Sequence, residues 1–352
     1  MRARWARAIP CLAILLCGFG PPCLGDQLAL PDFDVRSAEL GAIAKAAMPA
    51  LSAKSAVLVD FASGKVLFDK AAHQRLPPAS TTKMMTALLT LEDGNLDADG
   101  PVSALAAGQE GTSMGLKAGE RFTTRELLYG LLLPSGNDAA MALAQREAPS
   151  VQAFVDRMNA KAKELGMTDT HFVNPHGLDD PAHLSSAYDL ALLARYALQS
   201  EPLFDQYVMT PHMALPANAD HPAFQWDNLN QLLGSYPGAD GVKTGTTPAA
   251  GQCLVATVTR GGHRLLMVVM GSQDRYADAR AILDEGFGSY TWLRPDTAAP
   301  YPLPVVVRDT AEVILPQWEA AQVQEFVDLD AMNATFTVTG KQILQVPAEA
   351  LP

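Results

Sequence analysis

The chain has 352 residues, of which 48% are hydrophobic and 18% are charged, which is the composition of a globular protein and not of a disordered one. Its formal net charge of −12 argues against binding to nucleic acid. The length is sufficient for one large domain and a smaller one.

The first 25 residues have the pattern of a secretory signal peptide. Three arginines (Arg2, Arg4 and Arg7) precede an apolar stretch at residues 8–19, and small residues end the segment. The apolar stretch is too short for a good membrane-spanning helix, so we expect residues 1–25 to be removed, with an uncleaved anchor as the alternative. Loss of the three arginines takes the net charge from −12 to −15.

Cysteine usage excludes a disulfide framework in the mature protein. Three of the four cysteines lie in the signal, and Cys253 is left without a partner, although the compartment is expected to be oxidising. Cys253 lies in a strand-like stretch and is predicted to be a small buried residue, not a reactive thiol.

The first elements after the signal lead to a candidate nucleophile. A helical pattern covers residues 35–51. Two strand patterns follow at 56–60 and 65–68, and Gly64 between them predicts a tight turn and hence a β-hairpin. A proline-stiffened loop then leads into a helix that begins near Ser80.

Ser80 and Lys83 are the first residues with a chemical signal. A spacing of three places both side chains on one face of a helix, about 5–6 Å apart at Cβ, so the amine can take the proton of the hydroxyl. Because Ser-x-x-Lys is common on solvated helix faces, this pair alone is a weak signal.

The middle of the chain is predicted to be helical. Residues 123–126 (Thr-Thr-Arg-Glu) have the form of a capping box, and they open a buried helix at 127–133 that Pro134 ends. A polar turn that contains Ser135 and Asn137 follows. Further helices are expected at 139–146, 151–167 and 185–199, with a loop at 168–181 between the last two.

Strand patterns return after the helices. They lie at 241–247, 253–259 and 265–270, and a closing helix is expected at 275–286. Strands at both ends of this region and helices in the middle predict one sheet covered by a helical cluster. The fold class is therefore α+β, with one domain spanning 26–294.

Residues 295–352 are predicted to form a small all-β module. Several prolines after Trp292 mark a linker, and the tail lacks the Lys- and Arg-rich face of a membrane-surface helix. Membrane association through this end of the chain is therefore not expected. Strand patterns lie at 305–307, 312–315, 326–329, 334–339 and 342–346.

Three short motifs in a fixed order carry the chemistry. Ser-x-x-Lys at 80–83 is followed by Ser-Gly-Asn at 135–137 and by Lys-Thr-Gly at 243–245. Each is common alone, but the ordered set is far more specific for an activated serine. Lys83 must be neutral part of the time to act as a base, and the positive charge of Lys243 favours the neutral form.

Ser135 and Asn137 are predicted to serve the reaction from a loop between two helices. The Ser135 hydroxyl relays a proton between Lys83 and the leaving nitrogen, and the Asn137 amide binds a substrate carbonyl and orients Lys83. Asp138 is predicted to be a charge at a helix N-terminus and not a catalytic acid.

Residues 243–246 are predicted to bind the substrate. Lys243 offers a counter-charge to a carboxylate, and Thr244 and Gly245 lie on an exposed edge strand with which a peptide can pair. The backbone N–H groups of Ser80 and Thr246 form the expected oxyanion hole. The seven histidines show no metal-like grouping, so no metal or other cofactor is expected.

Around these motifs, the sequence resembles the serine-type D-alanyl-D-alanine carboxypeptidases, the low-molecular-mass penicillin-binding proteins of the bacterial envelope. The likeness covers about residues 35–290 and is carried by the segments 75–86, 127–140, 172–178 and 241–247. It implies the β-lactamase-like transpeptidase fold, which is an antiparallel sheet beside an all-helical cluster with the active site at their junction.

The resemblance also implies a reaction and a location. Ser80 would attack the carbonyl of the penultimate D-Ala of peptidoglycan stem peptides, release the terminal D-Ala and then be freed by water. β-Lactams would acylate the same serine as covalent inhibitors, and the enzyme would work in the periplasm or cell envelope. Thr246 stands where some relatives have histidine.

Three other functions share features of this sequence. A class A β-lactamase has the same motifs but also a loop glutamate, whereas residues 174–177 read Asn-Pro-His-Gly, which predicts slow deacylation of β-lactams. A D,D-endopeptidase acting on cross-links would use the same acyl-enzyme, so the motifs do not separate it from a carboxypeptidase. A non-catalytic peptidoglycan-binding protein would not need a nucleophile with its base.

Overall fold

The structure is a computed structural model that describes residues 50–293, 305–307, 312–317, 323–328, 333–338 and 341–350. The predicted signal peptide and nearly all of the helical pattern at 35–51 lie outside these ranges. No helix in the described ranges is long and apolar enough to cross a membrane.

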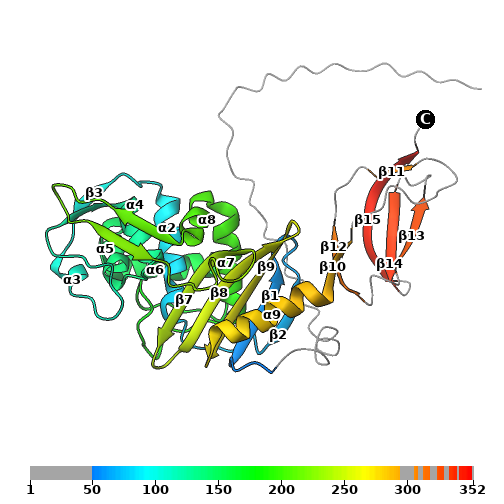
Figure 1. The fold of residues 1–352 in the computed structure, drawn as a ribbon, viewed down its shortest axis with the longest axis horizontal. Coiled ribbons are helices and arrows are strands. Elements are labelled where there is room, and N and C mark those ends of the chain that lie inside the picture. Colours follow the sequence, from blue (N-terminus) through cyan, green and yellow to red (C-terminus); the bar gives the residue numbers. More distant parts are fainter. Residues whose placement is uncertain are drawn as a thin grey trace, which may run out of the picture. The chain divides into compact units, whose positions relative to one another are not determined.

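Five antiparallel strands form the central sheet in the order β2-β1-β9-β8-β7 (Figure 1). The first two form the hairpin predicted from the sequence. The Lys-Thr-Gly motif lies on β7, at one edge of this sheet, as predicted, but its three residues are buried and not exposed. The strands are β1 (Ser55–Asp60), β2 (Val66–Lys70), β7 (Ala239–Thr247), β8 (Gly251–Arg260) and β9 (His263–Ser272).

Helices cover both faces of this sheet. Helix α9 (Arg275–Ser289) packs on β8 and β9, and its residue Ile282 shares an apolar cluster with Leu58 and Met267. Helix α7 (Ala187–Ser200) packs on β1 and β9. Because side chains alternate between the faces of a strand, coverage of both faces explains why all six residues of β1 are buried.

The helical cluster is built around α2 (Lys83–Asp93), which contacts α4, α5, α6, α7 and α8. Nine consecutive residues of α2, from Lys83 to Leu91, are buried, as expected of a helix surrounded by others. The predicted capping box opens α4, because Thr123 and Glu126 each bond the backbone N–H of the other. The other helices are α3 (Ala104–Ala107), α4 (Thr124–Leu132), α5 (Asn137–Glu147), α6 (Val151–Glu164) and α8 (Pro202–Met209).

Two short hairpins, which the sequence did not predict, complete this part of the protein. Strand β3 (Asp99–Pro101) pairs with β4 (Arg121–Thr123) just before α4. Strand β5 (His212–Leu215) pairs with β6 (Phe224–Asp227) between α8 and β7. Strands of three or four residues carry too little alternation to be recognised from sequence.

The C-terminal residues form strands, as predicted. Strands β11 (Val305–Val307), β13 (Val323–Asp328), β14 (Asn333–Val338) and β15 (Lys341–Ala350) form an antiparallel sheet in the order β11-β15-β14-β13. Strand β12 (Val313–Pro316) instead pairs with β10 (Tyr290–Leu293), and Ile314 joins the apolar cluster under α9. The domain boundary predicted at 294/295 therefore falls between two paired strands.

Candidate active site

Ser80 lies on a short 3₁₀ turn, η2 (Ala79–Thr82), that runs directly into α2. The preceding residue, Ala79, is buried and has φ +50°, a left-handed conformation that is uncommon for alanine. Two glycines contact this turn. A Cβ at Gly177 would overlap the Ala79 carbonyl oxygen, and a Cβ at Gly245 would lie 2.9 Å from the Ser80 nitrogen. Glycine is therefore required where the loop and the edge strand approach the backbone of Ala79 and Ser80.

Lys83, the first residue of α2, is fully buried and has its amine at the Ser80 hydroxyl. Its Nζ lies 2.8 Å from Ser80 Oγ, 2.7 Å from Asn137 Oδ1 and 2.9 Å from the His176 carbonyl oxygen. A neutral amine has two N–H groups and one lone pair. The amide and carbonyl oxygens can only accept, so they take the two N–H groups, and the lone pair is left to face the Ser80 hydroxyl.

Electrostatics favours the neutral form of this amine. Burial lowers the pKa of Lys83 well below its usual value, and the positive charge of Lys243 lowers it further, while Asp138 acts in the opposite direction. Lys243 is itself buried, and burial together with the charge of Arg275 lowers its pKa to about 7. The structure thus brings together the two lysines that the sequence motifs predicted to act together.

Ser135 is held in a constrained turn between α4 and α5. Its φ is +64°, and the hydroxyl of Thr112 donates to its carbonyl oxygen at 2.5 Å. The Ser135 Oγ is buried and has no hydrogen-bond partner among the described residues, although Ser135 lines the same pocket as Ser80. A buried hydroxyl without a partner is costly in a folded protein, so this one is available for a bound substrate.

Asn137 begins α5 and is engaged at both ends of its amide. Its Oδ1 accepts from Lys83, and its Nδ2 donates to the Glu110 carbonyl oxygen at 2.6 Å. This arrangement fits the orienting role predicted for the side chain. One Nδ2 hydrogen remains for a substrate carbonyl, because a primary amide has two.

Asp138 does more than place a charge at the start of α5. Its carboxylate accepts from the backbone N–H groups of Met114, Gly115 and Leu116 at 2.9–3.1 Å, and also from the Ser113 hydroxyl. The side chain therefore ties the loop that follows Thr112, a pocket residue, to the Ser-Gly-Asn turn. Sequence reasoning missed this role because the partners lie more than 20 positions away.

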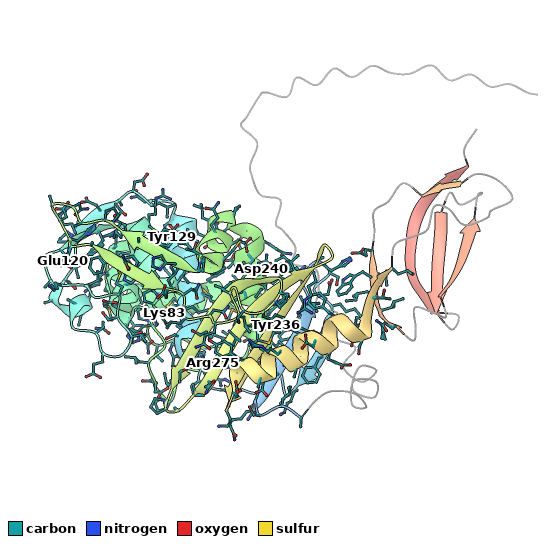
Figure 2. The ribbon with its side chains drawn as sticks, viewed as in Figure 1. Lys83, Glu120, Tyr129, Tyr236, Asp240 and Arg275 are labelled. Atoms are coloured by element: carbon teal, nitrogen blue, oxygen red, sulfur yellow. The ribbon has the colours of Figure 1, made fainter. Side chains whose placement is uncertain are left out.

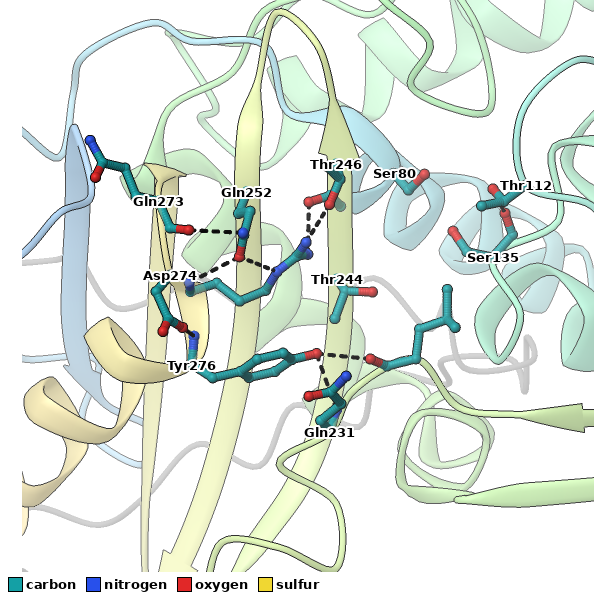
Figure 3. Close-up of a pocket in the computed structure, with 13 residues that line it drawn as sticks. Ser80, Thr112, Ser135, Gln231, Thr244, Thr246, Gln252, Gln273, Asp274 and Tyr276 are labelled. Atoms are coloured by element: carbon teal, nitrogen blue, oxygen red, sulfur yellow. Dashed lines mark hydrogen bonds between the residues drawn. The ribbon is translucent and has the colours of Figure 1, made fainter.

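The pocket in front of Ser80 has a volume of about 530 Å³ (Figure 3). Ser80, Thr112 and Ser135 form one side, and Thr244 and Thr246 approach from β7. Predicted residues that line the pocket are Ser80, Ser135, Thr244, Gly245 and Thr246, while Lys83, Asn137 and Lys243 are buried behind this surface.

Arg275 is a pocket residue that sequence reasoning missed. Figure 2 places it on α9, beside the sheet, whereas Lys83 lies among the helices. The guanidinium donates to the Gly245 carbonyl oxygen at 2.8 Å and to the Thr246 hydroxyl. The sequence did contain one signal for Arg275, because it begins the helix predicted at 275–286. A cation in the first turn of a helix is unfavourable to the helix dipole, so its presence there indicates another role.

Tyr276 closes the pocket beside Arg275. Its hydroxyl donates to the Leu229 carbonyl oxygen at 2.9 Å and accepts from the Gln231 N–H at 3.2 Å (Figure 3). These bonds tie the start of α9 to the chain between β6 and β7. No motif of the sequence indicated this contact.

The loop at 174–180 presents backbone, and not a carboxylate, to Lys83. The carbonyl that meets Lys83 belongs to His176. Asp179, the first acidic residue after Gly177, accepts from the Thr247 hydroxyl at 2.5 Å and from the Ala249 N–H at 3.1 Å. Both carboxylate oxygens of Asp179 thus accept hydrogen bonds at the end of β7.

Residues 42–274 match the sequence profile of peptidase family S11, the D-alanyl-D-alanine carboxypeptidases. The chain belongs to this family. The assignment made from the three motifs is therefore confirmed, and with it the classification as a serine peptidase.

The alignments with two named members of the family cover different shares of those proteins. The D-alanyl-D-alanine carboxypeptidase DacC of Escherichia coli is 34% identical over 314 residues, which span 84% of this chain and 77% of the relative. DacF of Bacillus subtilis is 42% identical over 246 residues, which span 68% of this chain and 63% of the relative. The matched region thus leaves over a third of the Bacillus relative uncovered.

Solved structures of the family share the fold. The D-alanyl-D-alanine carboxypeptidase DacD of Francisella tularensis has a TM-score of 0.71 at 26% identity, over 87% of this chain and 94% of that one. The Streptomyces K15 DD-transpeptidase has a TM-score of 0.65 at 35% identity, over 69% of this chain and 99% of that one. The predicted α+β fold, an antiparallel sheet beside a helical cluster, is confirmed.

Proposed function

We propose that this protein is a serine D,D-carboxypeptidase that removes the terminal D-Ala from peptidoglycan stem peptides through an acyl-enzyme on Ser80. The observation that carries the proposal is the setting of the Lys83 amine, 2.8 Å from Ser80 Oγ with its other two contacts made to oxygens that only accept. Binding alone would not require this arrangement.

Acylation transfers one proton and exchanges one bond. The Ser80 proton passes to the lone pair of Lys83 as Oγ bonds to the carbonyl carbon of the penultimate D-Ala. The oxyanion then accepts from the N–H groups of Ser80 and Thr246. As the C–N bond breaks, the amine of the departing D-Ala takes a proton that Ser135 relays from Lys83, and water later frees Ser80.

The substrate carboxylate is assigned to the β7 side of the pocket. Thr244 and Thr246 offer hydroxyl groups there, and Arg275 is the cation among the pocket residues. We propose that Arg275 shares the counter-charge role predicted for Lys243, which is 1% exposed and lies behind Thr244. Lys243 then acts chiefly through the pKa of Lys83.

The same chemistry gives the proposed partners and location. A β-lactam carries a reactive carbonyl and a carboxylate, so it would acylate Ser80 and act as a covalent inhibitor. Stem peptides lie outside the inner membrane, which agrees with the predicted signal peptide and with a periplasmic or cell-envelope enzyme.

The test is incubation with a stem pentapeptide that ends in D-Ala-D-Ala and, separately, with a cross-linked muropeptide, followed by mass spectrometry. We expect the pentapeptide to lose one D-Ala, and the Ser80→Ala variant to leave it intact. Cleavage of the cross-link alone would make the protein a D,D-endopeptidase. If neither substrate changes, the result would favour a non-catalytic binding protein.

A further inference from the structure

A chain of three hydrogen bonds, of which the two made by the Thr82 hydroxyl are buried, ends on the peptide bond that precedes Ser80. The Thr82 hydroxyl donates to the Ala79 carbonyl oxygen at 2.8 Å. His183 Nε2 lies 2.8 Å from the same Thr82 hydroxyl oxygen, and the Val173 N–H donates to His183 Nδ1 at 3.0 Å. Thr82 and His183 are 0% and 1% exposed, so water does not substitute for these partners.

The direction of this chain follows from its two ends. The backbone N–H of Val173 can only donate, so Nδ1 of His183 is an acceptor, and a neutral imidazole then carries its proton on Nε2. Burial lowers the pKa of His183 to about 4, which keeps the ring neutral at pH 7. His183 therefore donates to Thr82, and the Thr82 hydroxyl donates to Ala79.

The Ala79–Ser80 peptide unit is held from three sides. Gly177 packs against its carbonyl, and Gly245 packs against its N–H. Thr82 supplies the third contact through the carbonyl oxygen. Such support is needed because the φ of +50° at Ala79 is an unfavourable conformation that persists only when the surroundings enforce it.

This peptide unit contains the Ser80 N–H, one of the two donors assigned to the oxyanion hole. A hydrogen bond accepted by its carbonyl fixes the plane of the peptide and therefore the direction of the N–H. It also polarises the amide, so the N–H becomes a better donor, as in other hydrogen-bond chains.

We propose that Thr82 and His183 are positioning residues of the oxyanion hole, which aim the Ser80 N–H by holding the Ala79 carbonyl through a directed hydrogen-bond chain. The proposal rests on the proposed function, because it requires a tetrahedral intermediate at Ser80. Neither side chain lines the pocket, so both act through the Ala79–Ser80 backbone.

The test uses Thr82→Val, which removes the hydroxyl at nearly constant shape. Thr90→Val is the matched control, because the Thr90 hydroxyl is equally buried and donates to the Thr86 carbonyl oxygen within α2 at 2.9 Å. Thr82→Ser restores the donor. The readouts are the rate constant for acylation by benzylpenicillin, kcat and KM for the pentapeptide, Ki for a peptide boronate whose tetrahedral adduct occupies the oxyanion hole, and Tm.

Loss of an oxyanion-hole donor costs about 10²–10³ in rate, so a misaimed donor should cost about tenfold. We expect Thr82→Val to lower the acylation rate and kcat by about tenfold and to weaken boronate binding by a similar factor, with KM unchanged. Thr82→Ser should recover most of the rate. Thr90→Val should lower Tm by as much as Thr82→Val without these effects.

The His183 side chain gives an independent second test. His183→Gln keeps an N–H donor near the position of Nε2, whereas His183→Leu has none. We expect His183→Gln to acylate faster than His183→Leu at similar Tm. If Thr82→Val does not fold, this pair of variants tests the proposed role of the hydrogen-bond chain. Equal acylation rates in the His183 pair, or a folded Thr82→Val with the boronate Ki of the wild type, would overturn the proposal.

Failure of the proposed function would look different. A wild-type protein that is acylated by penicillin but releases no D-Ala would contradict the carboxypeptidase activity. The acylation rates would still report on the oxyanion hole, because acylation by a β-lactam passes through the same kind of tetrahedral intermediate.

Discussion

The charge of Lys243 lowers the pKa of Lys83, although Lys243 Nζ has one hydrogen bond among the described residues, to the Thr244 carbonyl oxygen at 3.1 Å. Both lysines are buried, so their charges are poorly screened by water. Asp138 partly offsets the effect. The Lys-Thr-Gly motif thus influences Lys83, the proposed base, from across the site.

The first prediction concerns the pH dependence of Lys243→Met. Activity requires neutral Lys83, so kcat/KM rises as pH rises through the pKa of Lys83. Removal of the Lys243 charge raises that pKa, and the acid limb of the profile should move to higher pH. The exposed Lys117→Met is the control and should keep the profile of the wild type. A limb that stays in place, or moves to lower pH, would contradict the assignment.

The second prediction concerns Arg275→Gln. If the guanidinium binds the substrate carboxylate, its loss should raise KM for the D-Ala-D-Ala peptide by about tenfold or more, since a charge-assisted hydrogen bond contributes about 1.5–3 kcal/mol. A peptide with a C-terminal carboxamide serves as the control substrate. Its KM should change little, and an equal rise for both peptides would show that Arg275 acts only by supporting Gly245 and Thr246.

The third prediction concerns close packing at the nucleophile. The Cβ of Gly245→Ala would lie 2.9 Å from the Ser80 nitrogen and 3.0 Å from the Ala79 Cβ, so β7 or the turn must shift. We expect acylation by benzylpenicillin to slow by about tenfold or more, because small displacements at a reacting centre are costly. Gly288→Ala has open space and should acylate as the wild type does. A Gly245→Ala protein that acylates normally would show that this contact is not needed.

The fourth prediction concerns stability. Asp138→Asn keeps the size of the side chain but replaces one carboxylate oxygen with a donor that faces backbone N–H groups. We expect the free energy of unfolding to fall by about 2–4 kcal/mol, because buried donors lose their acceptor. Asp97→Asn removes an exposed ion pair with Arg125 and should cost less than about 1 kcal/mol. Equal losses in denaturant titrations would refute the anchoring role of Asp138.

The fifth prediction concerns the fate of the β-lactam adduct. In the loop at 174–180, Asp179 is held by Thr247 and Ala249, and the group that meets Lys83 is a carbonyl. Because the loop offers Lys83 a carbonyl and holds Asp179 at the end of β7, we expect poor activation of a deacylating water, and the penicilloyl-enzyme should persist for minutes or longer in time-resolved intact-mass measurements. Hydrolysis of many penicillin molecules per second would contradict this prediction and favour a β-lactamase.

Local signals in the sequence predicted much of the fold. The capping box at Thr123 and Glu126 and the first hairpin were recognisable because each depends on neighbouring residues. The edge position of the Lys-Thr-Gly strand was predicted from its residue types, although it is set by the order of the strands in the sheet. The three motifs were recognisable for another reason. The chemistry proposed for them requires the three motifs to lie close together in the folded protein. The structure brings Lys83 into contact with Ser80 and Asn137.

Features that depend on distant contacts were not predictable. Asp138 meets a loop 22–24 positions earlier, and Arg275 meets Gly245 30 positions earlier, so no local pattern reports these pairs. The pairing of β12 with β10 was hidden for a related reason, because the prolines between them read as a linker. The roles of the individual site residues stay predictions that the experiments above decide.

The central claim is that Ser80, activated by Lys83, carries the acyl group. The most direct measurement is intact-protein mass spectrometry after incubation with benzylpenicillin, followed by peptide mapping of the adduct. The account predicts one added penicilloyl group on Ser80 in the wild type and none in a folded Ser80→Ala variant. An adduct on Ser80→Ala, or one that maps to another residue in the wild type, would contradict it.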